Sequence, residues 1–487
     1  MDRISQLPDF IVHHILSFLP DSPPAELVRM SVLSKTWFHL TASFPILNYD
    51  ICKFKSRESF FKYVECTTSR FCHQNLTAHR LTLYVTIRNP AELDIVNRCL
   101  GLLLVIGVKE LSMSMSAMPK YRLPNTLLSV SVLKSLSIYN CELPSSLMHD
   151  GVVKFKSLIS LQLQNVRIDE EVIKYITTGC PLLQWFEMRC CYGFKRFCVY
   201  QHQNLQRVGL VGTSVEIIDI EAPNLYNFYL AAKNAGRRPP KLNLASCKKL
   251  TSVTYEGYPS PNSNGFLSNF PFVENLNLFT SCEGNNLKLS SHSLRTLELF
   301  TDFDLEKIEL STPNLDLFIY CNDDYGWVGV RQLPHLKACM GCYPDGSIDT
   351  AWFQKLRLFL DKKMKFIVLE NIKENELPPF ELEHLELHFE HEESLDHAAF
   401  VDAVLCCFRP RFLTLRSSFP LTDSEEQSAL VKFTYERLLE QENQGHTSIQ
   451  IVSPYSSKAQ KQGLMLLADP LLEEKAISFI KEKRDAY

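Results

Sequence analysis

The chain has 487 residues, and its 51 Lys and Arg nearly balance its 55 Asp and Glu, which gives a formal charge of −4 at pH 7. This balance argues against nucleic acid or an anionic membrane as the main partner, and no run approaches the roughly 20 apolar residues that cross a bilayer. Because Asp2 and Arg3 make the N-terminus unlike a signal peptide, we expect an intracellular protein, cytoplasmic or nuclear. The 16 Cys then indicate reduced thiols that pack as small hydrophobic groups.

The first 45 residues predict three short helices. Pro8 suits the first turn of a helix, and the apolar residues after it have the spacing of one buried face: Ile11, Ile15, Phe18 and Leu19. Prolines end this helix, a second one runs through Leu27 and Val28, and Ser34 is the expected N-cap of a third. Because three short helices cannot build a large core, we expect their apolar surplus to face a partner.

These residues resemble the F-box, the segment through which F-box proteins bind a Skp1-like adaptor in cullin-based ubiquitin ligases. The resemblance rests on Leu7-Pro8, Ile15-Leu16, Leu19, Arg29 and the run from Val32 to Trp37. It implies that ten residues contact the adaptor or hold the shape that it binds: Leu7, Pro8, Ile11, Ile15, Leu16, Leu19, Leu33, Ser34, Lys35 and Trp37. The alternative is an ordinary three-helix bundle whose apolar face closes on its own core.

Leucine-rich triplets with the pattern LxxLxL recur further along the chain. Nine consecutive triplets begin at residues 133, 158, 183, 205, 225, 250, 273, 294 and 315, and degenerate ones begin at 78 and 108. The steps between the nine are 20 to 25 residues, inside the range of about 20 to 29 that is typical of leucine-rich repeats. Each triplet predicts a short strand whose alternate side chains enter a shared core.

These patterns predict an α/β protein in which a three-helix F-box precedes an irregular leucine-rich-repeat solenoid with a parallel concave sheet. We place the F-box at 1–45, a helical connection at 46–75, leucine-rich repeats at 76–330 and degenerate repeats at 331–415. A small α+β cap at 416–487 should contain a helix at about 422–442, a strand at 449–452 and a last helix from Asp469-Pro470 to Arg484. Together the two halves resemble plant F-box/LRR-repeat proteins.

Three cysteines follow predicted strands at the position where such repeats often carry Asn or Cys: Cys141, Cys191 and Cys247. This position satisfies backbone groups of the turn, so we expect a structural role for them.

Catalytic and metal-binding motifs are absent from the sequence: there is no GxSxG, P-loop, HExxH or paired CxxC. We therefore expect a non-catalytic chain without cofactor or metal. Four polar side chains would share one face of a strand and could hold a divalent metal: His384, Glu386, His388 and Glu390. The leucines between them keep the repeat register, which favours a solvated face. The basic segment 233–241 is interpreted as a solvated insertion.

The resemblance implies the substrate-recognition subunit of an SCF-type E3 ubiquitin ligase, which binds a Skp1-like adaptor, through it a cullin, and a target protein on the repeats. Because side chains alternate along a strand, the outward positions of the repeats would carry the target: Trp185, Glu187, Arg189, Arg207, Tyr229 and Glu298. A register shifted by one residue would instead bury Trp185. Two other functions stay open, a hormone-like small-molecule co-receptor and an adaptor-binding protein outside any ligase.

Overall fold

The computed structural model divides into two units, Met1–Thr251 and Ser252–Tyr487. The described residues are 7–18, 24–143, 155–232, 240–257, 266–280, 286–301, 307–312, 314–315, 317–322, 326–332, 336–342, 380–389, 408–417, 448–453 and 477–481, with single helical positions at 401, 405, 433, 434 and 437. No helix among these residues is long and apolar enough to span a bilayer.

The chain begins with the three predicted helices, α1 (Asp9–Ser17), α2 (Pro24–Ser31) and α3 (Lys35–Ala42). The expected N-cap of α3 is confirmed, because the Ser34 hydroxyl accepts a hydrogen bond of 3.1 Å from the backbone N–H of Trp37. A small core holds the three helices together: Val12, Leu16, Trp37, Leu40 and Phe44, with Leu27, Met30 and Ile46 packed against it.

Residues 46–75 contain a strand as well as the expected helix. Strand β1 (Ile46–Asp50) leads through a 3-10 turn (Ile51–Lys53) to helix α4 (Arg57–His73). Strand β1 pairs in parallel with β2 (Ala78–Thr86), so the connection is already part of the sheet. Its Tyr49 is fully buried and its hydroxyl lies 3.2 Å from the Thr68 hydroxyl of α4.

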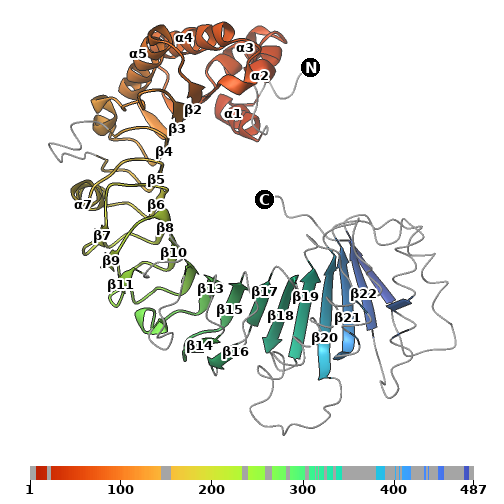
Figure 1. Ribbon diagram of the computed structural model, residues 1–487. Coiled ribbons are helices and arrows are strands. Elements are labelled where there is room, and N and C mark those ends of the chain that lie inside the picture. The colour runs from red at the N-terminus through yellow and green to blue at the C-terminus, as the bar shows by residue number, and fades with distance from the viewer. Residues whose placement is uncertain are drawn as a thin grey trace. The chain divides into compact units, whose positions relative to one another are not determined.

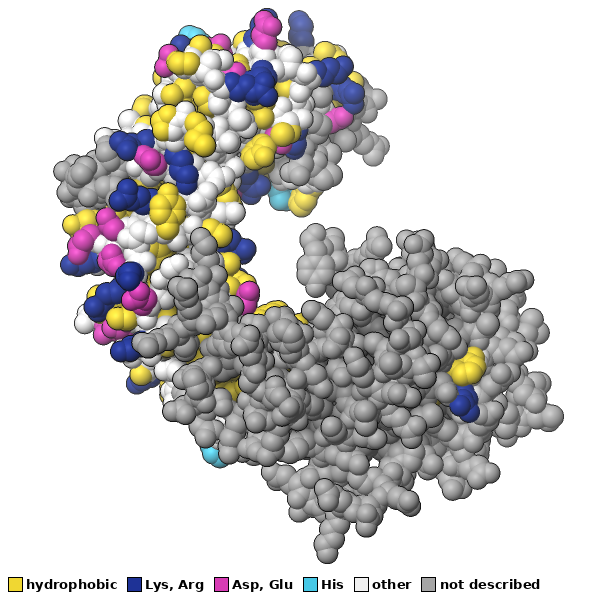
Figure 2. All heavy atoms as spheres, in the orientation of Figure 1, with side chains coloured by type: hydrophobic (Ala, Val, Ile, Leu, Met, Phe, Trp, Pro, Cys, Tyr) yellow, Lys and Arg dark blue, Asp and Glu magenta, His cyan; other side chains and the backbone are white. Residues whose placement is uncertain are grey.

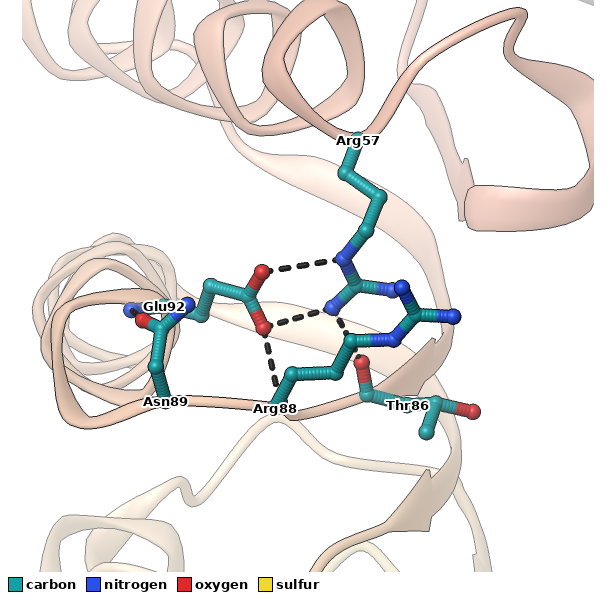
Figure 3. A network of polar contacts seen from close by, with 5 residues as sticks. All are labelled: Arg57, Thr86, Arg88, Asn89 and Glu92. Atoms are coloured by element: carbon teal, nitrogen blue, oxygen red, sulfur yellow. Dashed lines mark hydrogen bonds and ion pairs between the residues drawn. The ribbon is translucent and has the colours of Figure 1, made fainter.

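An ion pair joins α4 to the first repeat (Figure 3). The Glu92 carboxylate, in helix α5 (Pro90–Ile106), accepts hydrogen bonds of 2.9 and 2.5 Å from the Arg57 guanidinium of α4 and one of 2.7 Å from the Arg88 backbone N–H. The same guanidinium donates to the Thr86 carbonyl at the end of β2. These hydrogen bonds, and above all those from Arg57, hold the pKa of Glu92 below its usual range, although burial acts in the opposite direction.

The first unit continues the parallel sheet from β2 through β3 (Val108–Ser116), β4 (Ser135–Tyr139), β5 (Ser160–Gln164), β6 (Trp185–Arg189), β8 (Arg207–Thr213) and β10 (Asn227–Ala232). Between the strands lie a 3-10 helix (Asn125–Ser129), α7 (Glu170–Gly179) and a small parallel sheet of β7 (Arg196–Val199), β9 (Ile217–Ile220) and β11 (Lys241–Asn243). Figure 1 shows the main strands on the inner side of this unit, with α4, α5, α7 and the small sheet outside.

The predicted repeat register is confirmed. Every apolar residue of the eight triplets from Leu133 to Leu299 is at most 3% exposed. The three turn cysteines also have the predicted structural role, since their thiols donate to backbone carbonyls: Cys141 to Tyr139, Cys191 to Leu163 and Cys247 to Ile220. Burial raises the pKa of all three thiols, to about 12 for Cys141 and about 11 for Cys191.

The second unit begins with four parallel strands, β12 (Ser252–Glu256), β13 (Asn275–Thr280), β15 (Thr296–Thr301) and β17 (Leu317–Asn322). A 3-10 turn (Leu267–Asn269) and the parallel pair β14 (Asn286–Ser290) and β16 (Lys307–Ser311) lie in their connections. The further strands among its described residues are β18 (Gly326–Gln332), β19 (Leu336–Cys342), β20 (Phe380–Phe389), β21 (Phe408–Ser417), β22 (Ser448–Ser453) and β23 (Ile477–Lys481).

Two expectations for this half are corrected. Strand β18 pairs antiparallel with both β17 and β19, which departs from the parallel solenoid. The reason is short connections, since residues 323–325 and 333–335 are too few for the crossover that parallel strands need. The helix predicted to end at Arg484 is wrong at 477–481, where β23 pairs in parallel with β22. The strand predicted at 449–452 is confirmed as β22.

Candidate protein-docking surfaces

Helix α1 has two apolar faces, and only one of them is buried. Val12 and Leu16 fill the core and are at most 2% exposed, whereas Phe10 and Phe18 are 69% and 71% exposed. At about 100° per residue, Phe10, Phe18 and Ile15 lie within an arc of about 140° that points away from the core. Three large apolar residues on one side of this helix are therefore open to solvent in the isolated chain.

Further exposed apolar residues lie on α2, α3 and the turn between them. Its members are Val28, Val32, Leu33 and Phe38, which are 56%, 78%, 67% and 53% exposed. The turn is fixed in place, because the Leu33 N–H donates to the Met30 carbonyl at 3.1 Å and Ser34 caps the next helix. Exposed apolar groups gathered on so small a module are typical of a protein-binding site. We call this set, with Phe10, Ile15 and Phe18, the apolar docking face.

The structure divides the ten residues predicted from the F-box resemblance into separate groups. Seven are at least partly accessible: Leu7, Pro8, Ile11, Ile15, Leu33, Ser34 and Lys35. Leu16 and Trp37 belong to the module's core, so they support its shape, and Leu19 lies outside the described residues. The buried stripe predicted through Ile15 and Phe18 is wrong by one position, because Val12 and Leu16 take the core side of the helix.

Sequence reasoning missed five members of the apolar docking face as binding residues: Phe10, Phe18, Val28, Val32 and Phe38. A signal for Phe10 and Phe18 existed, because Phe10, His14 and Phe18 recur at every fourth position of a helix. The others gave none, since single apolar residues of short helices are equally compatible with a core.

The second candidate surface is the outward face of the main sheet in the first unit. Trp185 in β6 is 37% exposed, while its neighbour Phe186 is 1% exposed and Met188 is fully buried. Trp185 therefore points away from the core, as predicted. It pairs in register with Ser160 on one side and with Arg207 on the other.

Glu187 faces the same way as Trp185 and is nevertheless only 7% exposed. Two neighbours explain this. The Arg189 guanidinium donates to its carboxylate at 2.5 Å, and Gly209 lies directly opposite on β8. A Cβ at position 209 would come within 3.1 Å of the Glu187 Cγ, so the glycine makes room for the carboxylate to lie against the sheet. The result is an ion pair between Arg189 and Glu187 beside the exposed indole of Trp185.

The remaining predicted target residues fall in different places. The Arg207 guanidinium lies over the ring of Tyr226, 5.3 Å from its centroid, and is hydrogen-bonded to that phenol. Tyr229 is half-buried and lies opposite Gly209 in the register. Glu298 belongs to the second unit, where burial raises its pKa and Asn277 is its partner in the register. The structure thus brings Trp185, Glu187, Arg189, Arg207 and Tyr229 together on three adjacent strands.

The alternating segment of β20 follows the repeat register, as predicted, since Leu385 and Leu387 are fully buried. His384 Nε2 lies 2.7 Å from the Thr414 hydroxyl on β21. The side chains of His388 and Glu390 lie outside the described residues, as does most of the basic insertion at 233–241. Within the part of the chain that the structure describes, no three His, Cys, Asp or Glu side chains are grouped to hold a metal ion.

The chain was compared with known protein families and proteins. Residues 4–49 match the F-box domain, and residues 96–262 match the family described as "FBD-associated F-box protein At5g56370, LRR repeats". The chain is 30% identical over 210 residues to the Arabidopsis thaliana F-box/LRR-repeat protein At5g02910, which is 43% of each chain. It is 26% identical over 241 residues to F-box/LRR-repeat protein 25 of the same plant, covering 48% of this chain and 87% of that protein.

Proposed function

Because the chain is a plant-type F-box/LRR-repeat protein, we propose that it is the substrate-recognition subunit of an SCF-type E3 ubiquitin ligase. Residues 1–45 would dock on a Skp1-like adaptor and through it on a cullin, and the repeats would bind the target protein. The chain itself would catalyse no covalent step. Its contribution is proximity, since a target held beside the ubiquitin-conjugating enzyme reacts as if in an intramolecular step.

The apolar docking face carries this proposal. Residues such as Phe10, Phe18 and Val32 are each about 70% exposed or more, although the same module buries Val12 and Leu16 almost completely. Burying exposed apolar area stabilises an association by about 25 cal/mol per Å², so covering this face gives a partner a large favourable term. A module that served only to cap the repeats would have no use for it.

The test compares two sets of exposed apolar residues. In the first variant, Phe10→Ser, Val32→Ser and Leu33→Ser are combined on the apolar docking face. In the control variant, Leu102→Ser and Val105→Ser change two residues of α5 that are 44% and 78% exposed. We expect the first variant to lose at least about a hundredfold in affinity for a plant Skp1-like adaptor, measured by calorimetry. The control should bind like the parent protein.

Both variants should melt like the parent, because exposed apolar side chains contribute little to folding. The proposal is wrong if the folded first variant binds the adaptor as tightly as the parent, or if the parent does not bind it at all. Co-purification of a cullin with the parent, and its loss with the first variant, separates a ligase subunit from an adaptor-binding protein outside any ligase.

We place target binding on the outward face around Trp185. An exposed indole between fixed charged groups suits an interface anchor, since Trp, Tyr and Arg are enriched among residues that dominate binding energy. Combining Trp185→Ala, Arg189→Ala and Arg207→Ala should abolish capture of proteins that the parent enriches from plant extract. A control with Glu171→Ala and Lys174→Ala changes exposed residues on α7 and should capture the same proteins. Equal capture by the first variant would move target recognition elsewhere.

A further inference from the structure

A small pocket opens beside the apolar docking face. It lies between α2, α3, β1 and α4 and has a volume of about 70 Å³. Val28 and Phe38, which belong to the docking face, form part of its wall, and Tyr63, Thr67 and Arg70 line it from α4. The pocket is thus continuous with the surface proposed to bind the adaptor.

Arg70 is the one charged residue of the pocket lining, and its charge is not compensated within the described part of the chain. Its Nε atom is buried without a hydrogen-bond acceptor, and no described carboxylate forms an ion pair with its guanidinium. The nearby phenol of Tyr63 supplies no negative charge, because a phenol is neutral at pH 7 and burial raises its pKa further. Burying an N–H of a cation without an acceptor costs free energy, so a partner that supplies one gains from it.

We propose that this pocket receives an acidic side chain, Asp or Glu, of the Skp1-like adaptor, whose carboxylate pairs with Arg70. The inference rests on the proposed function. A guanidinium binds a carboxylate through two parallel hydrogen bonds, and the apolar wall around it excludes water from the pair. The volume fits one side chain, since sites for small organic ligands are typically about 300 to 1,000 Å³.

The adaptor is the favoured occupant because the pocket and the docking face share Val28 and Phe38. A partner that covers these two exposed residues also contacts the wall of the pocket. Apolar contacts on the docking face would then bring the adaptor into place, and the Arg70 ion pair would fix its orientation, because a charge pair discriminates strongly against wrong neighbours.

This arrangement predicts opposite effects of one substitution on folding and on binding. Arg70→Met keeps most of the apolar length of the side chain and removes the uncompensated charge. The melting temperature of the free protein should stay the same or rise, because an unpaired buried donor is removed. Adaptor affinity should fall at least about tenfold, because the adaptor's carboxylate then loses its partner.

Arg29→Met is the matched control. Arg29 lies on α2, its side chain is 75% exposed, and its ion pair with Glu26 at 2.7 Å is on the surface. Each variant loses one positive charge, Arg29 from α2 and Arg70 from the adjacent α4, so their long-range electrostatic effects on binding should be similar. Only the loss of a desolvated pair distinguishes them.

The experiment measures binding of a plant Skp1-like adaptor to the full chain by calorimetry. If the parent does not bind, the proposed function fails. If the parent binds and Arg70→Met binds as well as Arg29→Met does, the pocket proposal fails while the function stands. The surface Asp and Glu residues of the adaptor are then changed one at a time to Asn and Gln. One change should weaken binding to the parent about tenfold and have no further effect on Arg70→Met. If no acidic residue shows this coupling, the proposal is overturned.

Discussion

The N-terminal helical module and the repeats of the first unit use their apolar residues in opposite ways. In the repeats, each strand packs on the next, and the apolar triplet residues are almost completely buried. In the module, α1 buries Val12 and Leu16 but exposes Phe10 and Phe18. A repeat finds the neighbour that covers its leucines within its own chain. Among the described residues, none covers the second face of the module, and exposed apolar residues of this kind are typical of a protein-binding surface.

The surface charge sharpens this contrast. On the face that Figure 2 shows, basic and acidic side chains are interspersed over the repeats of the first unit. Charged groups there form exposed pairs across neighbouring turns, such as Arg80 with Glu110 and Lys195 with Glu216. Exposed pairs of this kind contribute little to stability, because water and salt screen them. The repeats of the first unit therefore present solvated charged groups, whereas the module presents apolar groups.

The largest change in stability is expected in α1, which has both a buried and an exposed apolar side. Leu16→Ala should destabilise the module by about 2 to 5 kcal/mol, since it leaves a cavity in a core of few residues. Ile15→Ala, at a residue that is 42% exposed, should change stability by about 0.5 kcal/mol or less but weaken adaptor binding. Amide hydrogen exchange of α1 measures the first effect and calorimetry the second. Equal destabilisation by both substitutions would mean that α1 has no free face.

Periodicity in the sequence predicted the repeats down to single side chains. A residue in a strand has only two directions, so once Phe186 and Met188 were assigned to the core, Trp185 had to point outward. In a helix, side chains point in many directions around the axis, so the buried side is harder to assign. Apolar residues cover so much of α1 that its core side could not be predicted, and the assignment to Ile15 was wrong by one position.

Features that depend on several distant segments could not be predicted either. The pocket around Arg70 is lined by two helices of the module, a strand and α4, and no local pattern marks it. The burial of Glu187 depends on a glycine 22 residues later, on the neighbouring strand. The antiparallel pairing of β18 depends on the short connections on both sides of it, and the leucine-rich pattern is too irregular there to reveal them.

A smaller effect concerns the ion pair that links the module's connection to the repeats. Glu92→Gln should lower the free energy of unfolding by about 1 to 3 kcal/mol at neutral pH, because the Arg57 guanidinium loses a charged partner. The control is Glu65→Gln, whose pair with Arg98 is exposed and should contribute about 0.5 kcal/mol or less. Chemical denaturation measures both.

The same pair makes a prediction about pH. The folded pKa of Glu92 is lower than its unfolded value, so its stabilisation is complete above the unfolded pKa of about 4.3 and is lost as pH falls through the folded pKa. The difference in stability between the parent and Glu92→Gln should therefore shrink as the pH is lowered below about 4. A difference that stays constant as the pH falls from about 5 through the folded pKa of Glu92 would show that Glu92 acts through packing alone.

The smallest effect tests whether the core of the repeats stays inaccessible to solvent in the native protein. Cys190 and Cys191 are adjacent, but Cys190 is exposed and Cys191 is 2% exposed, with its pKa raised by burial to about 11. At pH 8 a thiol of that pKa is only about one part in a thousand thiolate, and its burial also blocks the reagent. Iodoacetamide should therefore modify Cys190 in the native protein and Cys191 only after unfolding, as peptide mass spectrometry would show. Labelling of both at the same rate in native buffer would mean that the repeats open locally, and the contrast between a closed solenoid and an open module would no longer hold.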